Sequence, residues 1–226
     1  MGKIVDLIKK TLVYKKLYLP IVKKRSNSFY DERRELFRKE GFCALKEFVC
    51  CMEDVNIPFW LEFGTLLGAY RDGDFIPNDL DIDIGAHLSD ARRIYYALTQ
   101  RGFKLVREFH VVGENGLEQT YEYHGVTLDV MYFFEYKNQY WCNGVAFPSK
   151  WGKLVQVPVT AHWFKPFGIS FMVFKGIRVP IPDNVEEHLI EIFGNGFRVY
   201  DPDFPGDLNK KKYPFDEKCA WGIVHY

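Results

Sequence analysis

An alternation of acidic and aliphatic residues, Asp79-Leu80-Asp81-Ile82-Asp83-Ile84, constrains the fold of this 226-residue chain more than any other segment. Strict alternation with a period of two is typical of a β-strand whose aliphatic side chains face the core. The three aspartates then lie on the opposite face, each about 6.5–7 Å from the next. Like charges at that spacing repel one another, so the row needs either full solvation or a cation. Carboxylate oxygens on one side of a strand suit Mg²⁺ or Mn²⁺.

A second acidic residue, Asp129, interrupts an otherwise apolar segment over residues 126–134 that predicts another strand. An aspartate in such a strand is costly to bury without a partner, and a metal shared with Asp81 and Asp83 would supply one. The alternative is a strand of acids that simply face solvent. A calcium-binding EF-hand loop is excluded, because Ile84 and Asp90 stand where that loop needs Gly and Glu.

The turn Gly64-Thr65 lies between a predicted strand over residues 59–63 and a predicted helical piece over residues 66–71. Backbone N–H groups at a helix N-terminus attract anions, and glycine lets a ligand approach closely. The turn therefore suggests a phosphate site, with an ordinary strand-to-helix turn as the alternative. Together with the aspartates it forms a candidate phosphate-and-metal constellation.

The remaining pattern predicts a mixture of helices and strands. Helices are expected over residues 30–55 and 89–101, and a third begins after Asn184, with Glu187 completing a capping box and Gly194 ending it. Strands are expected over residues 104–111 and 120–123, followed after residue 134 by an aromatic, turn-rich stretch. The tail from Tyr200, which includes Lys210-Lys211-Lys212, is expected to be rich in loops.

The charge of the chain is zero only as a sum. Residues 1–25 carry eight basic side chains and one acidic one, a net charge of +7, which leaves −7 on the rest. We expect residues 1–26 to form a separate segment with a short basic amphipathic helix, whose pattern runs from Lys3 to Leu12 and which Pro20 ends, and residues 27–226 to form a single catalytic domain. The helix suits either an anionic membrane surface or packing on the domain with a solvated lysine face.

Composition excludes several classes of protein. With 47% hydrophobic residues and no net charge, the chain is neither disordered nor a nucleic-acid binder that depends on bulk charge. No apolar run is long enough to span a bilayer. The five cysteines show no C-x-x-C spacing, which favours reduced thiols in the cytoplasm over a disulfide framework or a zinc knuckle. Walker, G-x-G-x-x-G and G-x-S-x-G motifs are absent from the sequence.

The segment over residues 60–85 resembles the signature of the LicD / fukutin-related family, which runs roughly G-T-L-L-G-x-x-R and then I-P-W-D-D-D-I-D. Here the sequence reads Gly64 to Arg71 as GTLLGAYR and Ile76 to Asp83 as IPNDLDID. Asn78 stands where the family usually has Trp, and Leu80 where it usually has Asp. Looser similarity continues at Asp129 and over residues 179–184 and 193–194. The resemblance implies an α+β fold with a nucleotidyltransferase core similar to DNA polymerase beta, a mixed β-sheet flanked by helices.

The resemblance also implies an activity. Family members transfer a substituted phosphate (phosphocholine, phosphoethanolamine or a polyol phosphate) from a CDP-activated donor to a glycan hydroxyl, releasing CMP. The acceptor is expected to be a cell-surface glycan or its lipid-linked precursor, at the inner face of the cytoplasmic membrane. Carried over residue by residue, the metal ligands for Mg²⁺ or Mn²⁺ are Asp81, Asp83 and Asp129.

The other candidate positions are catalytic or bind substrate, and of these only Gly64 and Thr65 are carried over from the family. Asp79 is a candidate general base for the acceptor hydroxyl or a support for the metal site. The expected substrate-binding residues are Gly64, Thr65, Gly68 and Arg71. Arg71 suits a bidentate contact with phosphate, and a salt bridge with Asp72 or Asp74 is the alternative.

Three rival functions remain open on the sequence. A D-x-D glycosyltransferase would also bind a nucleotide diphosphate through a metal, but it normally has a longer Rossmann-like half before its D-x-D. A nucleotidyltransferase would move the nucleotide onto the acceptor and release pyrophosphate. A non-catalytic membrane-associated scaffold is the third. The aromatic residues between Tyr140 and Phe167 suggest a core, with a platform for a sugar or a cationic head group as the alternative.

Overall fold

The computed structural model describes residues 19–110, 117–145, 155–157, 159–201, 210–212 and 220–223. Its helices are α2 (Leu19–Asp54), α3 (Phe63–Leu67), α4 (Ala91–Gln100) and α5 (Val185–Phe193), with a π-helical turn over Gly68–Asp72 and a 3₁₀ turn over Leu88–Asp90. Its strands are β1 (Phe59–Leu61), β2 (Asp81–His87), β3 (Lys104–His110), β4 (Leu117–Tyr123), β5 (Val126–Tyr136), β6 (Gln139–Val145), β7 (Val155–Val157), β8 (Val159–Phe164), β9 (Ile169–Phe174), β10 (Ile177–Pro182), β11 (Lys210–Lys212) and β12 (Ala220–Ile223).

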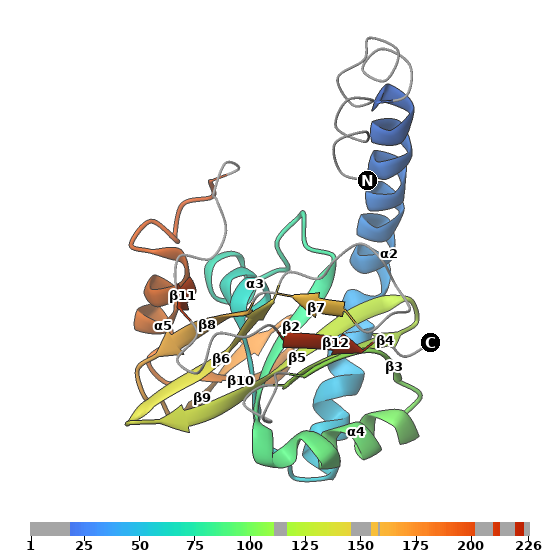
Figure 1. Cartoon of the computed structure of the whole chain (residues 1–226). Helices are drawn as coiled ribbons and strands as arrows, with labels where there is room; N and C mark the ends of the chain where they lie inside the picture. The colour runs from blue at the N-terminus through green and yellow to red at the C-terminus, as the bar shows by residue number, and fades with distance from the viewer. Residues whose placement is uncertain are drawn as a thin grey trace.

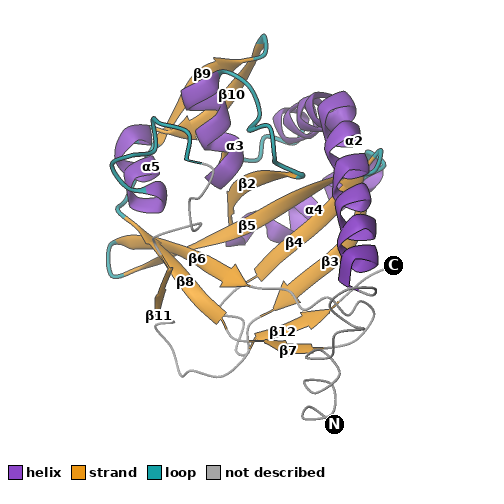
Figure 2. Cartoon of the chain, turned by 90° about the horizontal axis from the view of Figure 1, so that it is seen from above, coloured by secondary structure: helices purple, strands orange, loops and turns teal. Residues whose placement is uncertain are grey.

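The strands build one large mixed sheet and a separate β9–β10 hairpin. The order in the large sheet is β11-β8-β6-β5-β4-β3-β12-β7, and β2 joins it by pairing with both β1 and β5. The β2–β5 pair is parallel and the other pairs are antiparallel. Figure 2 shows β2, β5, β4 and β3 side by side in that order. The expected α+β fold with a mixed sheet flanked by helices is therefore confirmed.

The alternation in β2 sorts its side chains as predicted. Ile82 and Ile84 are fully buried and share a core cluster with apolar residues of α2 and α4. From β5, Leu128, Val130 and Tyr132 enter the same cluster. In Figure 1, α4 and the last turns of α2 lie on one side of the sheet and α3 lies on the other. The aspartates of β2 and β5 therefore face the side that carries α3.

The long helix α2 begins earlier than the sequence pattern predicted. Pro20 lies in the first turn of α2, which begins at Leu19. Proline is tolerated there, since the first N–H groups of a helix have no partner inside it. Residues before Leu19 lie outside the described ranges, so the expectation that Pro20 ends a preceding helix stays a prediction. The helix continues past residue 26 without a break. The predicted basic helix lies outside the described residues over residues 1–18 and stays a prediction.

Several elements in the second half of the chain differ from those predicted. Lys210-Lys211-Lys212, expected in a loop, forms β11 and pairs with β8. The stretch expected to be turn-rich instead contributes β6 and β8, which pair with each other. Asn184 does precede α5 and Gly194 does follow it, but Asn184 makes no side-chain capping bond. Phe147 and Trp151 of the aromatic stretch lie outside the described residues, whereas Trp141 and Phe164 are core residues.

Two further observations concern the cysteines and the helices. Cys43, Cys50, Cys51 and Cys142 are free thiols. Within the ranges that the structure describes, no helix combines the length and hydropathy needed to cross a bilayer.

Gly85 allows an unusually close contact beside the acidic face of β2. A Cβ atom at this position would lie 2.2 Å from Nε1 of the fully buried Trp60, its partner across the β1–β2 pair. We expect Gly85→Ala to lower the free energy of unfolding by about 1–3 kcal/mol, because the tightly packed indole has to shift. Urea denaturation measures this. Gly196→Ala is the control, since its Cβ would meet nothing within 4 Å; equal losses in both variants would contradict the packing argument.

Candidate functional site

Four adjacent strands place one row of polar side chains across the sheet. Asp83 of β2 is the register partner of Asp129 of β5, Asp129 faces Thr120 of β4, and Thr120 faces Arg107 of β3. Asp81 lies two residues before Asp83 and therefore on the same face. The structure thus brings together the three predicted metal ligands, although Asp83 and Asp129 are 46 residues apart in the sequence. The site is a cluster of carboxylates on a rigid sheet.

The short helix α3 fixes the position of Asp83. The Gly64 N–H donates to Oδ2 of Asp83 at 3.0 Å, and the Asp83 N–H donates to the Thr65 hydroxyl oxygen at 2.9 Å. Thr65 is fully buried. The anion at this helix N-terminus is therefore the protein's own carboxylate. The structure uses Gly64 and Thr65 to hold Asp83, and the direct phosphate contact expected for this turn stays a prediction.

Two arginines lie close to the carboxylates without neutralising all of them. From α2, Arg33 donates to the Thr127 hydroxyl at 2.9 Å and to the Leu80 carbonyl at 3.4 Å. From β3, Arg107 lies 3.5 Å from Asp129 and 3.8 Å from the buried Glu118. Both arginines lower the pKa of Asp81 and Asp129. The remaining negative charge leaves room for a divalent cation.

Burial and mutual repulsion raise the pKa values of the carboxyl groups. Burial, followed by the charge of Asp129, raises the pKa of Asp81 to about 6. Burial, with Asp81, Asp129 and Asp79 adding to it, raises the pKa of Asp83 well above its usual value. Burial also raises the pKa of Asp129, and burial with Asp129 raises that of Glu118 to about 8. Such a cluster is expensive to ionise unless a cation compensates it.

These shifts predict how stability depends on pH. A carboxyl group whose pKa is raised on folding binds its proton more tightly in the native state, so its contribution is lost as pH rises through the folded-state pKa. With Asp81 at about 6 and Glu118 at about 8, we expect the metal-free chain to lose about 2 kcal/mol, or about 4–8 °C in melting temperature, between pH 5.5 and 8.5. Thermal melts with a chelator measure this. Glu118→Gln should flatten the profile, because Glu118 titrates inside this pH range, and an unchanged slope in this variant would contradict the assignment.

Asp79 lies at the edge of the carboxylate cluster. Its N–H donates to the Ile76 carbonyl at 3.0 Å, and its Oδ2 lies 3.2 Å from the position of a Cβ atom at Gly64. Burial, followed by the charge of Asp81, raises the pKa of Asp79 to about 7. Its Oδ2 is buried, and within the described part of the chain it accepts no hydrogen bond. A free acceptor beside the predicted metal ligands is suited to receive a proton or to bind a cation.

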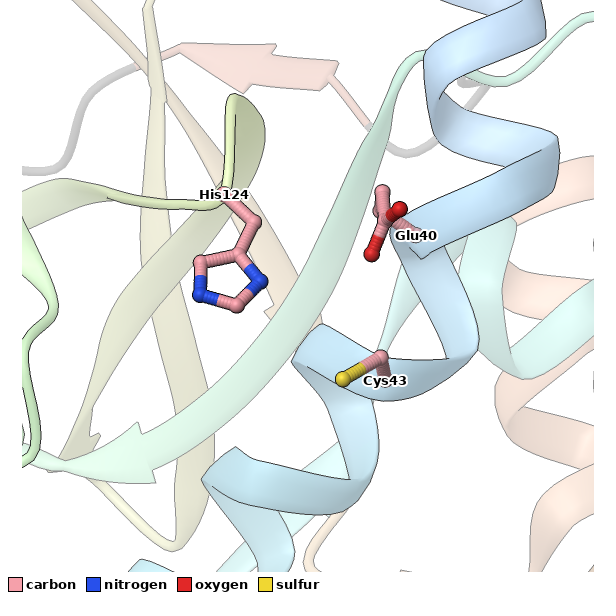
Figure 3. Close-up of side chains that lie close together, drawn as sticks. All are labelled: Glu40, Cys43 and His124. Carbon is pink, nitrogen blue, oxygen red and sulfur yellow. The ribbon is translucent and has the colours of Figure 1, made fainter.

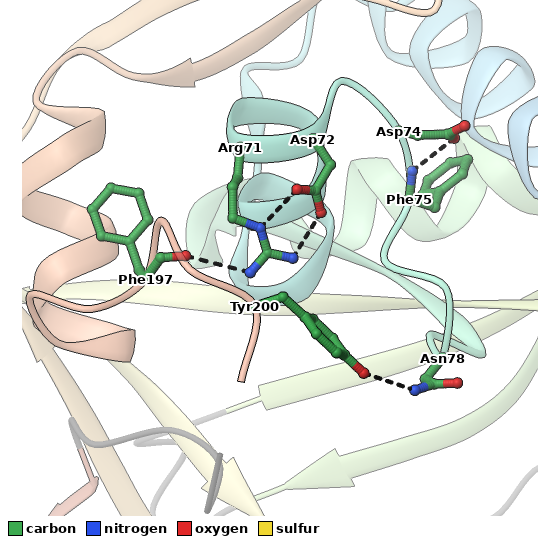
Figure 4. A network of polar contacts seen from close by, with 7 residues as sticks. All are labelled: Arg71, Asp72, Asp74, Phe75, Asn78, Phe197 and Tyr200. Atoms are coloured by element: carbon green, nitrogen blue, oxygen red, sulfur yellow. Dashed lines mark hydrogen bonds and ion pairs between the residues drawn. The ribbon is translucent and has the colours of Figure 1, made fainter. Parts of the chain in front are cut away.

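Arg71 forms a salt bridge with Asp72, which the sequence had left open as the alternative to a phosphate contact. Its guanidinium donates to both carboxylate oxygens of Asp72, at 2.8 and 2.7 Å, and to the Phe197 carbonyl at 3.3 Å (Figure 4). It also lies 5.9 Å from the centre of the Tyr200 ring, whose hydroxyl accepts from Asn78 at 3.4 Å. Here Arg71 lines a cavity of about 460 Å³ between the π-helical turn and residues 193–201.

Gly68, predicted to bind substrate, has a packing role in the structure. It is buried, and a Cβ atom there would lie 2.6 Å from the carbonyl oxygen of Asp74. The loop that leads to β2 therefore crosses directly over this glycine. Its effect on substrate binding stays a prediction.

A buried polar group next to α3 was not predicted. The carboxylate of Glu62, fully buried, accepts from Trp60 Nε1 at 2.7 Å and pairs with Nε2 of the fully buried His188 at 2.7 Å. It also accepts from the Phe63 N–H at 3.3 Å. Phe63 has a φ of 41°, a left-handed conformation that costs a bulky residue about 1–3 kcal/mol. Glu62 thus helps to hold the strained residue that precedes Gly64.

Sequence reasoning found the acids but missed the groups around them. Arg33 and Glu62 carry no local signal, because each meets its partners only through contacts far along the chain. Glu118 and Arg107 share a face with Asp129 only through the pairing of β3, β4 and β5. Each is followed by a polar residue, Gln119 and Glu108, so no clean alternation marks them in the sequence.

The fold and the site define an α+β domain that presents a carboxylate cluster of the kind that holds divalent cations. The chain belongs to the LicD/FKTN/FKRP family, because the model of that family's nucleotidyltransferase domain matches residues 56–184. The matched region contains both the turn at Gly64 and all of the aspartates described above.

Curated relatives agree with this assignment. The ribitol-5-phosphate transferase FKTN of Mus musculus is 28% identical over 166 residues, which cover 73% of this chain and 34% of the mouse protein. The ribitol 5-phosphate transferase FKRP of Mus musculus is 29% identical over 161 residues, 68% of this chain and 31% of that protein. The chain thus spans about a third of the length of these relatives.

A solved structure shows a weaker similarity. The lincosamide antibiotic adenylyltransferase LnuA in its lincomycin-bound form is 17% identical, with a TM-score of 0.43 over 73% of this chain and 90% of the other. A similarity at this level supports no argument about function.

Proposed function

We propose that this chain transfers a substituted phosphate from a CDP-linked donor to a glycan hydroxyl, releasing CMP, with Mg²⁺ or Mn²⁺ as cofactor. Family membership supports phosphate-group transfer, since the relatives FKTN and FKRP are named as ribitol-phosphate transferases. The observation that carries the proposal is the register of Asp83 against Asp129, with Asp81 on the same face.

The residues of the site fit a divalent cation. Asp81, Asp83 and Asp129 would hold it, because their oxygens are hard ligands and burial raises the pKa of all three, which makes them costly to ionise without a cation. A bound cation would neutralise charge on the donor's diphosphate and on the leaving CMP.

The chain's own residues would supply positioning and proton transfer. Gly64 and Thr65 orient Asp83, and Arg107 orients Asp129. Asp79, with a pKa of about 7 and a free buried oxygen, is the candidate group to accept the proton of the acceptor hydroxyl. The cavity of about 460 Å³ beside Arg71 offers room for part of a substrate.

The released product tests the proposal. We expect CMP to appear when the protein is incubated with Mg²⁺, a glycan hydroxyl acceptor and the right CDP-alcohol. CDP-ribitol leads the panel because the relatives are named as ribitol-phosphate transferases, followed by the glycerol, choline and ethanolamine derivatives. Thermal shift can choose the donor first, since a ligand at 100 times its dissociation constant stabilises by about 2.7 kcal/mol.

Other outcomes would replace the proposal. Release of pyrophosphate from a nucleoside triphosphate would indicate a nucleotidyltransferase. Stabilisation by a UDP-sugar alone, with transfer of the sugar, would indicate a glycosyltransferase. Absence of turnover with every donor, together with normal folding, would favour a scaffold.

A further inference from the structure

Three potential metal ligands converge outside the carboxylate cluster. Glu40 and Cys43 lie on α2, and His124 lies in the turn between β4 and β5. One ligand atom of each, a carboxylate oxygen, the thiol sulfur and a ring nitrogen, lies within 4.8 Å of the other two. Figure 3 shows the three side chains directed toward the space between α2 and the turn. None of them belongs to the site described above.

The fold brings these groups together through one face of α2. Arg33 contacts Thr127, and Leu36 packs so closely on the turn that a Cβ atom at Gly125 would lie 2.7 Å from it. Residues at steps of three and four along a helix share a face, so the contacts of positions 33 and 36 are continued by Glu40 and Cys43. The turn itself is short and fixed, with φ of 49° at His124 and 81° at Gly125.

The donor set has the chemistry of a zinc site rather than that of a magnesium site. Zn²⁺ binds thiolate, imidazole and carboxylate at about 2.0–2.3 Å, usually as a tetrahedron, and three protein ligands leave a fourth position for water. In a tetrahedron of that size the ligand atoms are about 3.3–3.8 Å apart. Cys43 and His124 are exposed and Glu40 is half-buried, so an ion can enter from solvent. Small side-chain rotations can shorten the distances between the ligand atoms from at most 4.8 Å to those of a tetrahedron.

We propose that Glu40, Cys43 and His124 form a second metal site, selective for Zn²⁺ or a similar borderline-soft cation. Binding releases the thiol proton of Cys43 to solvent and leaves Sγ, a ring nitrogen of His124 and the Glu40 carboxylate on the metal. The bound ion joins α2 to the β4–β5 turn. It lies about two helical turns from Arg33, which contacts Leu80 and Thr127 beside the carboxylate cluster. The proposal does not depend on the proposed activity.

Cobalt is a suitable probe, because Co²⁺ takes the same geometry as Zn²⁺ and shows a near-ultraviolet charge-transfer band when a thiolate binds it. We expect the reduced full chain to develop this band on titration with Co²⁺, and Zn²⁺ to abolish it by displacement. Cys43→Ser should eliminate the band. His124→Asn should weaken Co²⁺ binding by at least about 10-fold, and asparagine tolerates the positive φ of the turn.

Two controls separate this site from other ligands in the chain. Cys50→Ser removes another thiol of α2 and should leave the band unchanged. Asp83→Asn weakens the carboxylate cluster and should also leave it unchanged, so failure of the proposed function would not affect this result. A band that persists in Cys43→Ser, or that is absent from the wild-type chain, would overturn the proposal. Circular dichroism confirms that each variant folds.

Discussion

Asp83→Asn is expected to lower the rate of CMP release by about 10³-fold or more, equivalent to about 4 kcal/mol of lost transition-state stabilisation. Asp83 faces Asp129 across the parallel β2–β5 pair and is held by the Gly64 N–H. Asparagine keeps the shape and can still accept that hydrogen bond, but it removes one negative charge from the proposed metal ligands. Steady-state CMP release at several Mg²⁺ concentrations measures the effect, with calorimetry reporting Mg²⁺ affinity.

Asp74→Asn is the matched control for this experiment. Asp74 is exposed, lies in the loop before β2 and pairs with Lys175 at 2.5 Å, away from the carboxylate row. We expect its turnover to stay within about twofold of the wild type, because an exposed ion pair contributes little. If Asp83→Asn folds and retains wild-type turnover and Mg²⁺ affinity, Asp83 is no metal ligand and the site has to be reassigned.

The aspartates of the candidate site could be identified from local sequence patterns. Alternation is a local property, so the sequence alone could sort Asp81 and Asp83 onto one face and Ile82 onto the other. A single aspartate in an apolar strand is also visible locally, which identified Asp129. What no local pattern contains is the register that makes Asp83 and Asp129 direct neighbours. That register depends on contacts between segments 46 residues apart.

The same limit explains what the sequence did not reveal about the turn at Gly64. A glycine at a helix N-terminus predicts an anion site, and the structure does place an anion there. That group is the carboxylate of Asp83, 19 residues along the chain. The pattern identified the right physical chemistry, but only the folded arrangement shows that β2 lies close enough to supply the carboxylate.

Errors at the ends of elements have a different cause. Proline excludes only the interior of a helix, so Pro20 is compatible with the start of α2. The lysines at 210–212 have low strand propensity, yet they form β11 because β8 offers an open edge to pair with. Lysine is a common residue on such an edge strand, since its charge discourages pairing with a further chain.

The buried pair of Glu62 and His188 supports the segment that carries Gly64 and Thr65. Glu62 caps α3, and its backbone N–H donates to the Asp83 carbonyl at 3.1 Å. Its side chain is buried between Trp60 and His188, and the His188 ring stacks on Phe164 with 4.5 Å between ring centres. A buried carboxylate of this kind is stable only while its partners remain. Loss of His188 therefore affects the segment that carries Gly64 and Thr65.

We expect His188→Ala to lower the free energy of unfolding by about 3–5 kcal/mol, because it leaves the Glu62 carboxylate buried without a main partner and opens a cavity against Phe164. Urea denaturation measures the loss. Glu187→Ala, at the preceding position of α5, removes only an exposed ion pair with Lys165 and should leave the free energy of unfolding almost unchanged. Glu62→Gln combined with His188→Ala should recover part of the loss, because the neutral amide is cheaper to bury. If the double variant is no more stable than His188→Ala, the cost arises from the cavity alone and Glu62 does not depend on His188 for its burial.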